Sequence, residues 1–164
     1  MLTSINTQFV NALRLIFCIV LCEATGFISS LVAPVNADSW YSLLQKPEWN
    51  PPNYIFAPVW TTLYLLMGIA LWMIWNRPKS SARDAALYLF AAQLFLNFWW
   101  SVIFFKFHFM GLALVEILVM LLMIIVTIVR FSTFSKTAAW LLVPYAAWVS
   151  FASLLNYTLW SINS

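Results

Sequence analysis

Residues 112–129 read LALVEILVMLLMIIVTIV, an apolar run that contains one charged residue, Glu116. A transmembrane helix needs about 20 predominantly apolar residues to cross about 30 Å of hydrocarbon. Four further runs of similar length lie between short polar breaks, at residues 12–32, 55–75, 85–105 and 138–160. They are continuously apolar, whereas strands of a membrane barrel alternate apolar and polar residues over about ten positions. The sequence predicts one domain, residues 1–164, that is an all-α integral membrane protein with a bundle of five transmembrane helices.

The composition excludes most other classes of protein. Of the 164 residues, 64% are apolar and 8% are charged, whereas an average soluble domain is about 25% charged. So few charged side chains cannot solvate the surface of a soluble protein of this size, but they suffice in a bilayer. The apolar content excludes disorder, and two cysteines exclude a disulfide-stapled secreted scaffold. Eight scattered basic residues do not form a nucleic-acid-binding patch.

Basic residues predict the orientation in the membrane. With five spans, the N-terminus shares a side with the second and fourth connections, and the two sides differ in charge. That side carries Arg14, Arg77, Lys79, Arg83, Arg130 and Lys136, and the other carries Lys46 and Lys106. We therefore expect the N-terminus, residues 76–84 and residues 130–137 in the cytoplasm and the C-terminus outside. The first span lacks early basic residues and contains Glu23, which favours a retained helix over a signal peptide. The short ends favour a bacterial cell membrane.

The first connection differs from an ordinary linker. Residues 33–54 read APVNADSWYSLLQKPEWNPPNY, with no glycine, although flexible linkers are rich in Gly and Ser. Asp38 or Ser39 could cap a short helix through Gln45, which Pro47 would end. Trp and Tyr are common at membrane interfaces, so an interfacial belt is one interpretation. The spacing of the prolines favours a rigid, structured loop that covers a cavity.

This loop and the spans around it closely resemble the signature of the TspO family, which includes bacterial tryptophan-rich sensory proteins and the mitochondrial translocator protein, or peripheral-type benzodiazepine receptor. The matching strings cover about residues 26–160. They are Trp40-Tyr41, Leu44-Gln45-Lys46-Pro47, Trp49, Pro51-Pro52, Pro58-Val59-Trp60, Leu63-Tyr64, Met67-Gly68, Gln93, Asn97, Trp100, Phe104-Phe105, Met110-Gly111, Pro144-Tyr145, Ala147-Trp148, Phe151-Ala152 and Leu155-Asn156-Tyr157.

The resemblance implies a five-helix fold whose pocket lies inside the bundle, under the first loop. It also implies porphyrin ligands such as protoporphyrin IX, with sterols and synthetic benzodiazepine-type or isoquinoline ligands in some members, and a homodimer. Carried over by position, the implied ligand-binding residues come from the loop and all five helices. They are Ser30, Ala33, Trp40, Tyr41, Phe56, Ala57, Val59, Trp60, Asn97, Trp100, Leu112, Val115, Trp148, Ala152 and Leu155.

Helical spacing supports part of this assignment. Trp148, Ala152 and Leu155 share a helix face, and the small Ala152 between two large residues offers a shelf for a flat ligand. Gln93 and Asn97 are one turn apart and place two amides on one face of an apolar helix. Amides in hydrocarbon need partners, so we expect that face to turn inward. Either a helix–helix hydrogen bond or a ligand contact would satisfy them.

Two departures limit the resemblance. The animal proteins carry a cholesterol motif of an apolar residue, a Tyr and then a basic residue. Here Leu155 and Tyr157 are followed by no basic residue through Ser164, and the motif is weak evidence even when whole. Leu112 stands where the animal proteins have a Trp, which leaves affinity for the drug-like ligands open.

The acids, thiols and histidine of the spans and loops are further candidates for functional groups. Glu23 and Glu116 lie inside spans, where acids are costly and are functional candidates; for each we favour a packing hydrogen bond over a proton or ligand contact. Cys18 and Cys22, one turn apart, are interpreted as small buried thiols, because bridging them would strain a disulfide. His108 alone cannot make a metal site, so no metal or required cofactor is expected, and a tetrapyrrole would be held by shape and stacking.

The favoured function is binding of porphyrins and similar apolar ligands, for sensing, sequestration or translocation. One alternative is an enzyme that degrades porphyrin in light and oxygen, since some bacterial members are reported to do so with Trp at the positions of Trp60 and Trp148. Another is a sterol or lipid translocator. With no inverted repeat, mid-depth helix break or coupling-ion cluster apparent, active secondary transport is disfavoured. A structural scaffold would leave the first loop unexplained.

Overall fold

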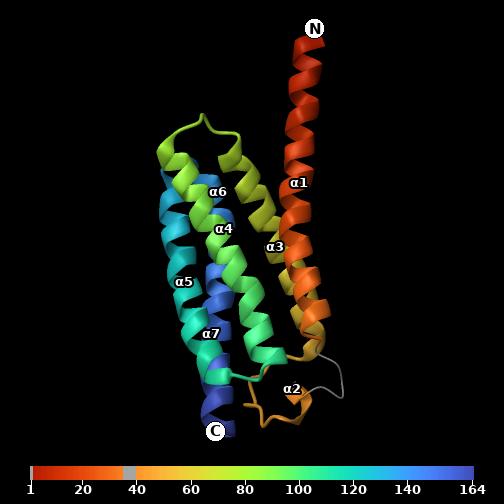
Figure 1. The fold of residues 1–164 in the computed structure, drawn as a ribbon, viewed down its shortest axis with the longest axis vertical. Coiled ribbons are helices and arrows are strands. Elements are labelled where there is room, and N and C mark those ends of the chain that lie inside the picture. The colour runs from red at the N-terminus through yellow and green to blue at the C-terminus, as the bar shows by residue number, and fades with distance from the viewer. Residues whose placement is uncertain (1, 35–39) are drawn as a thin grey trace.

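The computed structural model describes residues 2–34 and 40–164 and shows five long helices that form one bundle (Figure 1). The spans are Gln8–Val32, Asn53–Trp75, Ser81–Lys106, Met110–Ser132 and Lys136–Asn163, each long and apolar enough to cross a bilayer. The helices are α1 (Leu2–Val32), α2 (Trp40–Leu43), α3 (Asn53–Trp75), α4 (Ser81–Ser101), the π-helix η1 (Val102–Lys106), α5 (Met110–Ser132), α6 (Lys136–Leu141) and α7 (Val143–Asn163). The prediction of an all-α, five-span membrane protein is confirmed.

The helices extend beyond the predicted runs, by ten residues at the start of α1 and by a few elsewhere, because hydropathy marks the hydrocarbon-crossing part and not the polar helix ends. Ser80 caps α4 by accepting a 3.1 Å hydrogen bond from the backbone N–H of Arg83. Ser135 caps α6 in the same way, accepting from the N–H of Ala138 at 3.2 Å. Both caps satisfy amide donors that have no partner inside the helix.

The third and fifth spans are not uniform α-helices, contrary to the simplest reading of the apolar runs. The fifth span divides at Leu142, two residues before Pro144. Proline lacks a backbone N–H and fits the first turn of a helix but not its interior, so α7 begins anew there. The third span ends in η1, where the N–H of Phe107 bonds the carbonyl of Val102.

The connections lie at two ends of the bundle, as an odd number of spans requires. Figure 1 shows the N-terminus at the same end as the α3–α4 and α5–α6 connections. The C-terminus, α2 and the α4–α5 connection lie at the opposite end. The cytoplasmic placement of the first end stays a prediction.

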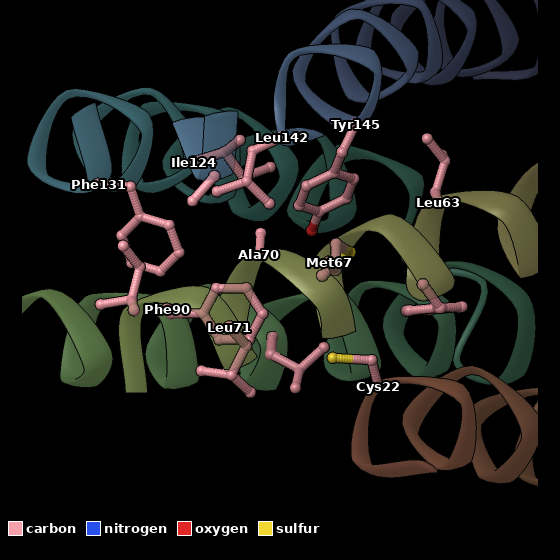
Figure 2. Close-up of a cluster of buried hydrophobic side chains, with 14 of the residues drawn as sticks. Cys22, Leu63, Met67, Ala70, Leu71, Phe90, Ile124, Phe131, Leu142 and Tyr145 are labelled. Atoms are coloured by element: carbon pink, nitrogen blue, oxygen red, sulfur yellow. The ribbon is translucent and has the colours of Figure 1, made fainter. Parts of the chain in front are cut away.

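A buried apolar core joins the helices. In Figure 2, Cys22 of α1 and Tyr145 of α7 point toward Met67 of α3. Cys18 and Cys22 are free and fully buried, which confirms their interpretation as small buried thiols. The opposite faces of the helices remain apolar and exposed, as for Leu118, 51% exposed, on α5. Such a surface suits lipid and not water.

The first loop is tied to the bundle at several points. The N–H of Gln45 donates to Oδ1 of Asn163 at 2.9 Å, and Nδ2 of Asn163 donates to the carbonyl of Gln45 at 3.0 Å. Trp49 packs edge-on against Phe151 with ring centroids 5.8 Å apart. The predicted structured loop is therefore present, but its helix ends at Leu43 and not at Gln45. The predicted cap at Asp38 or Ser39 lies outside the described residues.

Candidate ligand-binding site

A cavity of about 870 Å³ lies within the bundle, and its walls come from α1, α3, α4, η1 and α7, with Tyr41 of α2 at the loop end. Binding sites for small molecules have volumes of about 300–1,000 Å³ and mostly apolar linings. Aromatic and aliphatic side chains form most of this wall. The cavity therefore has the size and chemistry of a site for a large apolar ligand.

Ten of the fifteen residues assigned to the pocket from the sequence lie on this wall. They are Ser30, Ala33, Tyr41, Phe56, Ala57, Trp60, Trp100, Trp148, Ala152 and Leu155. Those on α7 follow the spacing argument, because Trp148, Ala152 and Leu155 all face the same cavity. The structure thus brings these positions together around one space, while their contact with a ligand stays a prediction.

Two of the assigned residues lie on the outer surface of the bundle, which corrects their placement. Leu112 is 55% exposed and Val115 is 60% exposed, on the lipid-facing side of α5. The inward face of this helix is formed by Ala113 and Ile117, which are buried. Because side chains around a helix are about 100° apart per residue, a helix that buries Ala113 and Ile117 turns Leu112 and Val115 outward.

The remaining three are near the cavity but not on its wall. The Trp40 ring stacks on His108, with centroids 4.2 Å apart, so it fastens α2 to the α4–α5 turn. Val59 packs against the buried core beside Trp60. Asn97 is buried behind the wall, where its Oδ1 accepts a hydrogen bond from the hydroxyl of Tyr64, a wall residue.

Three tryptophans give the wall broad flat faces. Trp60 stacks on Tyr64 with centroids 5.4 Å apart, and Trp148 lies 5.9 Å from Phe56 in an edge-on arrangement. The Trp100 indole Nε1 donates to Oδ1 of Asn156 at 3.1 Å. Each ring is thereby held in place before any ligand enters, which lowers the entropic cost of binding.

Buried amides connect α4 to its neighbours. Asn97 Nδ2 donates to the Tyr145 hydroxyl at 3.1 Å, and that hydroxyl donates to Oε1 of Gln93 at 2.8 Å. Gln93 is 1% exposed and Asn97 is 3% exposed, so the expected inward orientation is confirmed. With the bond from Tyr64 to Asn97, these hydrogen bonds join α3, α4 and α7 behind the cavity wall. The two amides therefore find their partners on neighbouring helices, which is one of the two interpretations offered from the sequence.

The two acids within spans differ in position. Glu23 lies on the cavity wall, near Tyr64 but without a hydrogen bond to any described residue. Both carboxyl oxygens of Glu116 are enclosed, and neither has a hydrogen-bond partner in the described part of the chain. The packing hydrogen bond favoured for each acid is therefore not found among the described residues.

At the loop end, Tyr41 closes the wall with its hydroxyl donating to Oδ1 of Asn50 at 3.0 Å. Burial raises the pKa of the Tyr41 phenol, and the bond to Asn50 acts in the opposite direction. Its hydroxyl therefore remains neutral near pH 7, and Nζ of Lys46 lies 4.8 Å from the centroid of the ring.

Sequence reasoning missed several wall residues. Phe104, Phe105 and Phe151 contribute rings, and Ile19 and Phe27 contribute the α1 side. The apolar residues of α1 carried no signal, because every face of a membrane helix is apolar. Glu23 did carry one: a carboxyl within a span commonly faces the bundle interior or a cavity.

The TspO/MBR family model matches residues 18–161. The chain belongs to this family. It is 43% identical over 152 residues to the tryptophan-rich protein TspO of Chlorobaculum tepidum, covering 92% of this chain and 96% of the relative. The translocator protein of Bos taurus is 41% identical over 140 residues, covering 84% and 83%. The tryptophan-rich sensory protein of Cereibacter sphaeroides is 36% identical over 142 residues, covering 87% and 86%. The TspO resemblance drawn from the first loop is thus confirmed.

Proposed function

We propose that this TspO-family membrane protein binds planar tetrapyrroles of the porphyrin class in the cavity, for sensing, sequestration or translocation. The observation that carries the proposal is a space of about 870 Å³ whose wall includes Trp60, Trp100 and Trp148. Indole rings offer large flat apolar faces, and aromatic pairs gain about 0.5–1.5 kcal/mol beyond the burial of their area. A macrocycle with a broad π surface matches such a wall better than a flexible chain does. Because the chain belongs to the TspO/MBR family, the proposal also includes a homodimer and the binding of benzodiazepine-type or isoquinoline ligands.

Filling the cavity should abolish porphyrin binding. Ala152→Phe adds a ring to the shelf between Trp148 and Leu155, so we expect saturable quenching of tryptophan fluorescence by protoporphyrin IX, in darkness, to weaken at least tenfold. Leu154→Phe on the same helix is the matched control, because Leu154 is 56% exposed on the outer surface and should leave binding unchanged. Equal quenching in wild type and both variants would place the porphyrin outside this cavity and overturn the proposal.

A second candidate function is porphyrin breakdown by dioxygen in light. The observation that favours it is that Trp60 and Trp148 both line the cavity, so a photoexcited ligand would lie beside two oxidisable indoles. With both replaced by Phe, we expect the light-dependent loss of porphyrin absorbance to fall at least tenfold while dark binding largely persists. Replacing Trp99 and Trp140, which are 38% and 71% exposed, is the control of equal composition. Undiminished photolysis in the cavity variant would remove both residues from the mechanism.

A further inference from the structure

The cavity wall carries an acidic side chain, and none of its described residues is basic. Glu23 is the carboxyl group on the described wall, and no Lys, Arg or His contributes to that wall. The other polar members are hydroxyls, amides and indoles, such as Ser101 and Asn53. At the loop end of the cavity, Nζ of Lys46 lies 4.8 Å from the ring centroid of the wall residue Tyr41. The wall therefore offers a carboxyl acceptor to a cation or an N–H donor, and its described residues offer no positive charge to an anion.

Glu23 lies deep in the membrane-spanning part of α1. The span runs from Gln8 to Val32, so several residues separate Glu23 from either end. A carboxyl at such depth is costly unless a partner or a cavity compensates. The nearby Tyr64 hydroxyl is not that partner, because it donates to Asn97. Glu23 lines the cavity with Gly26 and Ser30 on the same side of α1, and its carboxyl bonds none of the described residues.

We propose that Glu23 selects the class of ligand: its carboxyl accepts hydrogen bonds from an ammonium or other N–H group of the bound molecule and excludes carboxylates from the deep part of the cavity. The inference rests on the proposed porphyrin function and adds the orientation of the porphyrin within the cavity. Acidic side groups of a tetrapyrrole point toward the loop and Lys46, and nitrogen-bearing groups point toward Glu23. Charge-assisted hydrogen bonds are about twice as strong as neutral ones, so one carboxyl can decide between ligands of equal shape.

Three probes that share one macrocycle test this selection. They are protoporphyrin IX, its neutral dimethyl ester, and its diamide with two ethylenediamine arms, which carries two ammonium groups. We expect Glu23→Gln to weaken binding of the diamide about tenfold, to leave the ester within about twofold, and to strengthen binding of the diacid. Glu23→Asp keeps the charge and should keep the preference for the diamide.

Glu116→Gln is the matched control, because it makes the same substitution in a span at a residue that does not line the cavity. It should leave the affinity ratios of the three probes unchanged. Unaltered ester binding by Glu23→Gln shows that the cavity is intact, so a misfolded variant cannot imitate the expected result. If all three probes bind and Glu23→Gln leaves their ratios at wild-type values, this inference fails and the proposed function stands. If no probe binds the wild-type protein, both fail.

Discussion

Gly68→Ala is expected to destabilise the bundle by roughly 3 kcal/mol, although alanine favours a helix over glycine by about 1 kcal/mol. An ideal Cβ at Gly68 would lie 2.7 Å from Cα of Ile19 and 3.0 Å from the carbonyl oxygen of Cys18. These are backbone atoms of α1, so the contact cannot be relieved by turning a side chain. The helix axes must separate, and α1 would lose its close packing on α3.

Gly111→Ala is the control for this substitution. The Cβ added there would lie 3.2 Å from the ring of Trp160, a side chain that can shift by a few tenths of an ångström. We expect Gly111→Ala to change stability little or to raise it. The free energy of unfolding of both variants, measured by denaturant titration in detergent micelles, decides the matter. Equal stability of Gly68→Ala and the wild-type protein would show that α1 and α3 are not held this closely.

The spans could be predicted because the bilayer fixes both the length and the composition of a crossing helix. The division of the fifth span also had a visible signal, Pro144. The π-helix did not, because residues 102–105 continue the apolar run of the helix before them and Lys106 marks only the end of the span. Hydropathy indicates where the chain enters and leaves the hydrocarbon. It does not show whether the backbone inside the span has the hydrogen bonds of an α-helix or of a π-helix.

The site could be predicted where the sequence shows which face of a helix turns toward the inside of the bundle. On α7, Trp148 and Ala152 define a face by spacing, and the structure places that face on the cavity. On α5, nearly every residue is apolar, so Leu112 and Val115 were assigned by resemblance and proved to face outward. Glu23 was recognised as an acid within a span, which is a signal for a position facing the bundle interior or a cavity, and the structure places it on the cavity wall.

Replacing Asn97 by Leu should destabilise the protein, because one amide serves two hydroxyls. Its Oδ1 accepts from the Tyr64 hydroxyl and its Nδ2 donates to the Tyr145 hydroxyl. Removing one partner from a buried polar group costs about 1–3 kcal/mol, and this substitution removes a partner from each of two tyrosines. We expect a loss of roughly 3 kcal/mol in the free energy of unfolding. Asn97→Asp, which keeps the acceptor, should retain part of the stability.

Glu116→Leu tests the opposite case with the same measurement. No described residue bonds the two enclosed oxygens of Glu116, so leucine of similar volume removes a desolvated carboxyl and breaks no hydrogen bond. We expect stability to rise by roughly 1–3 kcal/mol. Opposite signs for Asn97→Leu and Glu116→Leu would show that polar groups stabilise the bundle only where they are hydrogen-bonded, as they are between α3, α4 and α7. A loss of stability in Glu116→Leu would mean that its carboxyl has a partner in the membrane, such as water or a second copy of the chain.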